Sequence, residues 1–528
     1  MPLESVIYFL PFLLIRKSIA MLSPAPTPAP QLAMDWQAIS STVRVRIAPS
    51  PTGNLHVGTA RTALFNYLFA KRHNGTFILR IEDTDTERSN AAYAQNIFDS
   101  LRAMGMQWDE GPDVGGPYAP YTQMERLPDY QRAIQALIDH GYAYAAYETP
   151  EELDAQREAA KAANVAYKYM PPSEAVRAQQ AADPTRVGSI RFRIPPERQT
   201  IIVDDAVRGS VSFDAQLIGD FVIQKFNGVP TYNFAVVVDD VAMKITHVVR
   251  GEDHLSNTPK QILIYEALAA CGLAPKALPQ FAHVGMILAP DRSKLSKRHG
   301  ATAVSDFIAQ GYLPEAFCNF ITLLGWAPSE GQEFAPLAEH AAQFSLERIA
   351  HSPAIFETDK LHWLNKQYLK ALDDKAFLAL GQPYLETAGI SLAAYTPEQQ
   401  ALIMHLVREP LTLISELPEA VRYFVDPLPP YAQDIVDTLL SQPEATPILS
   451  AFQAQLLPLL HANATVDELK AGIKALTESL QPLKTKTVMW TVRAALTGRT
   501  GGADMAPMLQ LLGAVRCQAR IALAQALV

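Results

Sequence analysis

The stretch VRVRIAPSPTGNLHVGTARTALFNYLFAKRHNGTFILRIE, residues 43–82, decides the fold. Its first letters, VRVRIA, alternate and are rich in β-branched residues, which predicts a strand, and PSPTG supplies a turn. Apolar residues then recur at helical spacing from His56 to His73, and TFILRIE returns to the strand pattern. A strand, a turn, a helix and a strand in this order form a βαβ unit. Such a unit implies a parallel sheet that binds a ligand at the carboxyl ends of its strands.

The turn at the start of the expected helix has features that suit a nucleotide. A helix N-terminus offers unpaired N–H groups to phosphate, and Gly58 lets the backbone approach a flat base. His56 can donate a hydrogen bond to a phosphate oxygen as negative charge develops. No GxxxxGK motif occurs here, so the turn is not a P-loop. Taken alone, an HxG turn is more often an ordinary strand-to-helix connection with an exposed histidine.

A second signal lies in PDRSKLSKRHG, residues 290–300. Such a dense cationic loop, with a serine and Gly300, can fold over a triphosphate and neutralise charge on the departing pyrophosphate. Its candidate catalytic cations are Lys294, Lys297 and Arg298. A charge run alone is usually a solvated loop, but the two signals together are far more specific than either one.

Both signals carry a family resemblance. HVGT resembles the HIGH motif, and KLSKR resembles the KMSKS loop, of class I aminoacyl-tRNA synthetases. Further blocks resemble bacterial glutamyl-tRNA synthetases from about residue 43 to the C-terminus: RIAPSPTG, ALFNYLFAK, RIEDTD, GPDVGGPY, PTYNFAVVVDD, HVVRGEDH, GYLPEAFCNFITLLGW and FETDKLHWLN. The resemblance implies that glutamate and ATP form an adenylate, with Mg²⁺ beside the triphosphate. The terminal adenosine of a tRNA then receives the glutamate.

The resemblance also implies an α/β fold with a Rossmann-type class I catalytic domain. An acceptor-binding domain is inserted into it, and an all-α anticodon-binding domain follows. The expected segments are an N-terminal extension (1–42), the first catalytic half (43–119), the insertion (120–220), the second catalytic half (221–290), the KLSKR loop with a stem-contact region (291–370) and the helical domain (371–528).

Local patterns refine this division. In the insertion, IRFRI, TIIVDD and VSFD predict short strands, and PEELDAQREAAKAA predicts an exposed helix. In the second catalytic half, FVIQK, AVVVDD and THVVRGED predict strands, and Pro259 to Ala269 predicts a helix. After about Lys370 the pattern becomes nearly all helical.

A glutamate ligand has two carboxylates and one ammonium group, so its pocket should offer arginines and one acid. Arg46 and Arg250 stand at strand ends, and arginine gives bidentate, permanently charged recognition of a carboxylate. Glu82 is the expected partner of the α-ammonium group, and Ser50 and Tyr232 can add hydroxyl contacts. The alternative for each charged residue is a structural salt bridge at a strand end.

The resemblance places ATP between His56 and Lys297. Asp253 is expected near the ribose, and the backbone of Met286 and Ile287 is expected near the adenine. The full expected ATP-binding set is Pro49, Gly53, His56, Gly58, Thr59, Asp253, Met286, Ile287, Ser296 and Lys297. The expected catalytic set is His56, Lys294, Lys297 and Arg298.

Metal and RNA partners follow from the same comparison. Some relatives carry a zinc site built largely from cysteines in the insertion, but YAYAAYETPEEL (142–153) holds no cysteine or histidine, so we predict no zinc. The tRNA is expected to contact the insertion and the helical third. The candidate tRNA-binding residues are Arg408, Arg422, Arg493 and Arg499. The partner is tRNA(Glu), and charging of tRNA(Gln) stays open.

Bulk properties set weaker limits. The net charge of −9 argues mildly against a nucleic-acid partner, although a large acidic enzyme can carry local basic patches. The chain holds three widely separated cysteines, Cys271, Cys318 and Cys517. They predict buried thiols and a reducing cytoplasm. We expect a monomer.

The apolar run SVIYFLPFLLI (5–15) is too short to span a bilayer. It is either a functional anchor or a sign that translation begins later, at Met21 or Met34. Apart from the anchor, residues 1–42 are expected to be a disordered extension or a mis-assigned start.

Three other functions compete with this one. A glutaminyl-type ligase usually ends in β-barrels, whereas this chain ends in helical patterns. A paralogue that glutamylates a base in a tRNA anticodon would lack the helical domain. An inactive RNA-binding or scaffold protein would need lesions in HVGT or KLSKR, and both motifs are intact.

Overall fold

The predicted βαβ unit is present in the computed structural model, which describes residues 42–165, 167–329 and 331–527. The expectations for the N-terminal extension, including the anchor, therefore lie outside the described residues. Strand β1 (Arg44–Ile47) runs parallel to β2 (Thr76–Leu79), and α3 (Val57–Arg72) connects them. The register pairs each residue of β1 with its counterpart in β2.

Helix α3 forms because its sequence satisfies both ends and fills a core. The His56 side chain accepts a hydrogen bond from the Gly58 N–H at the first turn, and Lys71 and Arg72 face the negative end of the helix dipole. Most of its apolar residues are buried, including Leu64 and Phe65, which belong to the same core cluster as the two strands. This packing holds the turn before α3 against the sheet.

The second half of the catalytic domain adds a sheet whose strand order is β6-β5-β9-β8. Strands β8 (His247–Gly251) and β9 (Gln280–Val284) are parallel, and β5 (Thr200–Asp205) lies parallel to β9 on its other side. Strand β6 (Gly209–Asp214) forms an antiparallel hairpin with β5. The TIIVDD and VSFD strands, placed in the insertion from sequence, thus hydrogen-bond to the sheet that carries β8 and β9.

The strand predicted at AVVVDD is wrong, because this segment lies in α8 (Tyr232–Ala242). Its residues from Phe234 to Asp240 are all buried, so the β-branched run is packed on every side rather than on two alternating faces. A short continuous apolar run has no periodicity that separates a buried strand from a buried helix. The helix predicted next is confirmed as α9 (Thr258–Ala270).

A three-stranded antiparallel sheet crosses the expected boundary between the insertion and the second catalytic half, because the FVIQK strand, predicted in that half, pairs with a strand of the insertion. Its strands, in spatial order, are β3 (Ala143–Ala146), β4 (Ser189–Phe192) and β7 (Phe221–Gln224). The exposed helix predicted at PEELDAQREAAKAA is confirmed as α6 (Pro150–Ala162), which has no buried residue and begins with a capping box between Thr149 and Glu152. Two further helices precede and follow β3: α5 (Leu127–Asp139) and α7 (Glu174–Ala182), whereas α4 (Ala91–Ala103) packs in the core cluster of α3.

Short elements on both sides of the KLSKR loop pack on the core cluster that contains α3. They are β10 (Ile287–Leu288), α10 (Val304–Gln310), α11 (Pro314–Thr322), α12 (Leu337–Gln343), β11 (Ala354–Ile355) and α13 (Thr358–Ala371). Strand β10 pairs with β11 in parallel. Leu361 and Leu364 of α13 are buried in the same cluster as α3.

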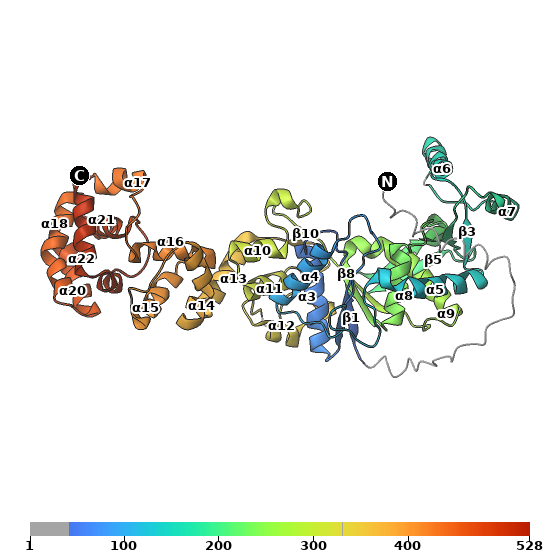
Figure 1. Ribbon diagram of the computed structural model, residues 1–528, viewed down its shortest axis with the longest axis horizontal. Coiled ribbons are helices and arrows are strands. Elements are labelled where there is room, and N and C mark those ends of the chain that lie inside the picture. Colours follow the sequence, from blue (N-terminus) through green and yellow to red (C-terminus); the bar gives the residue numbers. More distant parts are fainter. Residues whose placement is uncertain (1–41, 166, 330, 528) are drawn as a thin grey trace, which may run out of the picture. The chain divides into compact units, whose positions relative to one another are not determined.

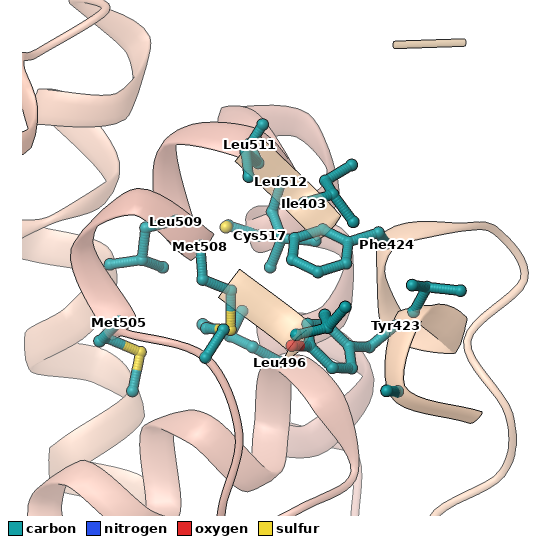
Figure 2. Close-up of a cluster of buried hydrophobic side chains, with 14 of the residues drawn as sticks. Ile403, Tyr423, Phe424, Leu496, Met505, Met508, Leu509, Leu511, Leu512 and Cys517 are labelled. Atoms are coloured by element: carbon teal, nitrogen blue, oxygen red, sulfur yellow. The ribbon is translucent and has the colours of Figure 1, made fainter. Parts of the chain in front are cut away.

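The described part after α13 is helical throughout, as predicted, and Figure 1 draws it in orange and red. Its helices are α14 (Asp374–Thr387), α15 (Pro397–Arg408), α16 (Leu417–Val421), α17 (Gln433–Ile435), α18 (Ala445–Gln455), α19 (Leu457–His461), α20 (Val466–Ser479), α21 (Thr485–Thr497) and α22 (Met505–Gln525). Figure 2 shows Ile403, Phe424, Met508 and Leu512 gathered in its core. Cys517 is buried there too.

Two of the three cysteines are buried as predicted, and Cys271 is only partly buried. All three are free thiols. In the described segments, no helix combines the length and apolar character needed to cross a membrane.

Gly75 lies directly against the backbone of Val43, the residue before β1. A Cβ at this position would lie 2.3 Å from the Val43 carbonyl oxygen, which accepts the Thr76 N–H. We expect Gly75→Ala to lower the free energy of unfolding by about 1–3 kcal/mol, because backbone atoms of the strand pair must separate. Gly501→Ala, where nothing lies within 4 Å of the added Cβ, is the matched control. Equal denaturation midpoints for the two variants would contradict this account.

Candidate active site

A cleft of about 570 Å³ lies at the carboxyl ends of β1, β8 and β9, where the βαβ pattern predicted a ligand. This volume is in the range of small-molecule sites, roughly 300–1,000 Å³. The cleft brings together residues from motifs that are up to about 240 positions apart in the chain. The predicted site residues that line it are Arg46, Pro49, Ser50, His56, Gly58, Thr59, Glu82, Tyr232, Arg250, Asp253, Met286, Ile287 and Lys294.

The two nucleotide motifs meet through backbone hydrogen bonds. The Val57 N–H donates to the Thr302 carbonyl at 2.9 Å, and the Val304 N–H donates to the Leu55 carbonyl at 3.0 Å. These bonds place the segment after KLSKR beside the HVGT turn. Lys294, at the start of KLSKR, accordingly lines the cleft.

Four predicted residues do not line the cleft: Gly53, Ser296, Lys297 and Arg298. Lys297 and Arg298 are exposed and lie in the short 3₁₀ turn Lys297–His299. The Ser296 N–H donates to His299 Nδ1 at 3.2 Å, which closes this turn. Contact of these four residues with ATP stays a prediction.

His56 is arranged as a neutral hydrogen-bond donor. Its Nδ1 accepts the Gly58 N–H at 3.1 Å, so the proton of the neutral ring lies on Nε2. Burial lowers the pKa of His56, and the positive charge of Lys294 lowers it further. The imidazole is therefore uncharged near neutral pH, with Nε2–H available to a ligand.

A buried charge network surrounds Arg46. Arg46 Nε lies 3.1 Å from Asp240 Oδ1, and Arg80 Nη1 lies 2.7 Å from the same oxygen. Arg126 Nε lies 2.6 Å from Asp239. The salt-bridge alternative therefore holds for two of the guanidinium nitrogens of Arg46, because Nε and Nη2 both donate to Asp240.

Glu82 is the acid of this network that lines the cleft. Burial raises its pKa to about 7, although the positive charges of Arg80 and Arg46 oppose the rise. Its closest cation, Arg80, lies 3.4 Å away. A bound ammonium group would favour the ionised form of this carboxyl, since a neighbouring positive charge lowers an acid's pKa.

Arg250 is buried, and its hydrogen-bond partners are neutral. Nη2 donates to Thr258 Oγ1 at 2.9 Å and to Gln261 Oε1 at 2.7 Å. Nε donates to His283 Nε2 at 3.1 Å, and Nη1 lies 3.5 Å from the Tyr232 hydroxyl. The positive charge of Arg250 is thus not neutralised by any of these partners, and the side chain lines the cleft.

Sequence reasoning missed several residues that line the cleft: Arg61, Thr62, Glu252, His254 and Asn257. Two of them support the backbone expected near the adenine. Glu252 Oε1 accepts the Met286 N–H at 2.7 Å, and Arg61 donates to the carbonyls of Gly285 and Leu324. Both residues could have been predicted in part from the sequence, because they neighbour predicted site residues. Arg61 lies one helical turn after Gly58, and Glu252 directly precedes Asp253.

The candidate tRNA-binding arginines have partners inside the helical domain. Arg408 Nη2 lies 3.1 Å from Asp374, Arg493 donates to the Ala503 carbonyl at 2.5 Å, and Arg499 pairs with Glu419. Arg422 is half-buried. RNA contact by these four residues stays a prediction.

Burial of His247 makes stability depend on pH. Burial lowers the pKa of His247 to about 4, and His73 contributes to the shift. An unfolded histidine takes up its proton near pH 6.5, so below this pH the unfolded chain binds more protons at this position than the folded chain. The contribution of His247 to stability is therefore present above about pH 6.5 and is lost as the pH falls towards 4.

The variant His247→Gln tests this assignment, because the loss at low pH is absent in it. The melting temperature of the variant, relative to that of the wild type, should therefore be higher at pH 5 than at pH 7.5. A constant difference would contradict the assignment.

Comparison with known proteins decides the family. Residues 42–363 match the model of the catalytic domain of class I tRNA synthetases (E and Q), and residues 337–525 match an anticodon binding domain. The chain belongs to this synthetase family. The synthetase has the α/β catalytic domain and helical C-terminal domain that the resemblance implied, so both expectations are confirmed.

Relatives agree over nearly the whole length of the synthetase. A glutamate–tRNA ligase of Carboxydothermus hydrogenoformans is 44% identical, over 91% of this chain and 99% of the relative. One of Halalkalibacterium halodurans is also 44% identical, over 90% and 97%. The crystal structure of a glutamate tRNA ligase from Elizabethkingia meningosepticum in complex with its amino acid has a TM-score of 0.80 at 33% identity, and the match covers 92% of this chain and 99% of that one.

Proposed function

We propose that this synthetase ligates L-glutamate to the 3′-terminal adenosine of tRNA(Glu) through a glutamyl-adenylate. The observation that carries the proposal is that one cleft contains an arginine, Arg250, whose partners among the described residues are all neutral, together with a buried acid, Glu82, and a neutral histidine donor, His56. Relatives that match almost end to end are named glutamate–tRNA ligases.

The glutamate subsite lies between Arg250 and Glu82. One substrate carboxylate pairs with Arg250, which keeps its full positive charge for that purpose. The α-ammonium group pairs with Glu82, and Ser50 and Tyr232 add hydroxyl contacts from the same cleft. Arg46 acts with Asp240 as part of the cleft wall and presents its remaining nitrogen to the ligand.

The ATP subsite lies between His56 and the KLSKR loop. A glutamate carboxylate oxygen attacks the α-phosphorus, the bond to the bridging oxygen breaks, and pyrophosphate leaves with the electron pair. His56 Nε2–H donates to the phosphate oxygens as their charge increases, and Lys294, which lines the same cleft, adds positive charge. Lys297 and Arg298 act when the exposed loop folds over the triphosphate.

Mg²⁺ is expected to enter with ATP and to neutralise part of the triphosphate charge. Among the described residues, no group of three or more histidine, cysteine or acidic side chains is placed to hold a metal ion. Mg²⁺ keeps several waters and commonly takes only one or two protein carboxylates, so phosphate oxygens and water are its expected main ligands. Glu252 is already bound to Arg208 and to the Met286 N–H, and Asp253, which also lines the cleft, is proposed to lie near the ribose. Absence of zinc stays a prediction.

In the second step the 2′-hydroxyl of the terminal adenosine attacks the activated carbonyl, and AMP leaves. The insertion is proposed to hold the acceptor end, and the helical domain to read the anticodon by stacking and edge hydrogen bonds. A charging assay with purified tRNA(Gln) decides whether the same site also glutamylates that tRNA. We further propose that the protein acts as a monomer in the cytoplasm.

The amino-acid specificity tests this proposal. With ATP and unfractionated tRNA, we expect the synthetase to esterify glutamate and to leave glutamine and aspartate largely unused. Acid-gel analysis of tRNA charged with each radiolabelled amino acid gives the answer. Preferential use of glutamine would contradict the assignment and would favour a glutaminyl-type ligase.

A further inference from the structure

Arg250 is held by a buried pair of residues that come from two neighbouring strands. Arg250 on β8 and His283 on β9 are direct partners in the parallel register, and Asp205 ends β5 on the far side of β9. His283 and Asp205 have fully buried side chains. The three side chains form a chain of hydrogen bonds that runs across the sheet to the cleft.

Asp205 is fixed at one end of this chain. Its Oδ1 accepts the backbone N–H groups of Val207 at 3.0 Å and Arg208 at 2.8 Å. Its Oδ2 lies 2.6 Å from His283 Nδ1, and the His283 backbone N–H lies 3.1 Å from both oxygens. Burial opposes ionisation of Asp205, but the hydrogen bonds from His283 and the backbone outweigh it and lower its pKa to about 2. Asp205 is therefore a carboxylate that can only accept.

The carboxylate determines where His283 carries its proton. Since Asp205 Oδ2 only accepts, His283 Nδ1 must carry the hydrogen and donate it. Burial lowers the pKa of His283, and Arg250 and Arg208 lower it further, although Asp205 opposes them. The ring is then neutral, and Nε2 accepts the Arg250 Nε–H at 3.1 Å.

A neutral acceptor has a different effect on an arginine from that of an acid. Arg46 meets a carboxylate, Asp240, and its charge is neutralised in place. Arg250 meets an imidazole nitrogen, a hydroxyl and an amide, which fix the plane of the guanidinium and leave its charge for a ligand. A fixed and uncompensated guanidinium favours a carboxylate over a neutral amide.

We propose that Asp205 and His283 are positioning residues for amino-acid selection, which hold Arg250 in its orientation through a single histidine tautomer. Neither residue lines the cleft. The inference rests on the proposed function, because it takes Arg250 as the residue that binds a glutamate carboxylate.

Asp205→Asn tests the tautomer directly. The backbone N–H groups that reach Oδ1 require an acceptor there, so the asparagine amide NH₂ must occupy the Oδ2 position. It would donate to His283 Nδ1 and move the ring proton to Nε2. Two donors, His283 Nε2–H and Arg250 Nε–H, would then face each other, and the hydrogen bond between them would be lost. We expect the KM for glutamate in tRNA charging to rise roughly ten- to a hundredfold, because misplaced binding groups cost about this factor. The KM for ATP should change less than twofold.

The matched control is Asp204→Asn, on the exposed face of the same strand. It should leave both KM values unchanged. An active Asp205→Asn variant with an unchanged KM for glutamate would overturn the inference while leaving the proposed function intact. A wild-type chain that charges no tRNA with glutamate would overturn the proposed function itself.

A second comparison keeps the inference testable if Asp205→Asn does not fold. His283→Gln retains an oxygen that can accept the Arg250 Nε–H, whereas His283→Leu does not. We expect the glutamate KM of His283→Leu to exceed that of His283→Gln by about tenfold, while their melting temperatures and KM values for ATP stay similar. Equal glutamate KM values for the two variants would overturn the inference.

Discussion

Lys297→Ala is expected to slow glutamyl-adenylate formation by roughly a hundred- to a thousandfold, the usual cost of removing one group that stabilises developing charge. Because Lys297 is exposed and does not line the cleft, we propose that its ammonium group acts only after the KLSKR loop has folded over the triphosphate. The effect should therefore fall on the rate of the chemical step and should leave the KM for glutamate nearly unchanged.

Rapid-quench measurement of pyrophosphate release, with tRNA present, separates this step from product release. Lys276→Ala is the control, because Lys276 is an exposed lysine on the loop before β9 and does not line the cleft. A near-normal burst rate in Lys297→Ala would remove Lys297 from the catalytic set and leave Lys294 as the candidate cation.

Arg250→Gln should have the second large effect, on glutamate binding. It removes the charge that pairs with a substrate carboxylate and leaves the acceptors on Thr258, Gln261 and His283 without their donor. Loss of one partner from a desolvated charge pair typically costs about 2–5 kcal/mol, so kcat/KM for glutamate should fall on the order of a hundredfold or more. The ratio of glutamate to glutamine use should fall with it.

Steady-state charging with varied glutamate and glutamine measures both effects. Arg250→Lys should recover only part of the loss, because an ammonium group keeps the positive charge but lacks the planar, bidentate donor geometry of a guanidinium. Arg132→Gln, on the exposed face of α5, is the control. Unchanged discrimination in Arg250→Gln would place the amino-acid carboxylate elsewhere in the cleft.

The cleft was predictable because parallel strands end at one edge of a sheet. Arg46, Glu82 and Arg250 are far apart in sequence, yet each stands at or near a strand end, and the structure brings all three to one cleft. The strand predicted at AVVVDD, which forms part of α8, is wrong for the opposite reason. Its apolar run is buried on all sides, so tertiary packing rather than periodicity determines its form.

The partners of these residues could not be predicted. The bond between Arg46 and Asp240 depends on α8 being a helix, and the chain from Asp205 to Arg250 depends on β5 joining the sheet beside β9. Strand order between segments about 80 residues apart leaves no local trace in a single sequence. The KLSKR cations were found by type, but the position of Lys297 and Arg298 outside the cleft reflects a loop conformation that composition does not encode.

Charging of purified tRNA tests the central claim most directly. Purified tRNA(Glu) and tRNA(Gln) are incubated separately with the full chain, labelled glutamate and ATP, and esterified glutamate, AMP and pyrophosphate are counted. The account predicts glutamate on tRNA(Glu), with one AMP and one pyrophosphate formed for each ester. The result for tRNA(Gln) decides only whether the anticodon domain discriminates between the two. Absence of esterified glutamate on both tRNAs, with ATP present and the protein folded, would contradict the account.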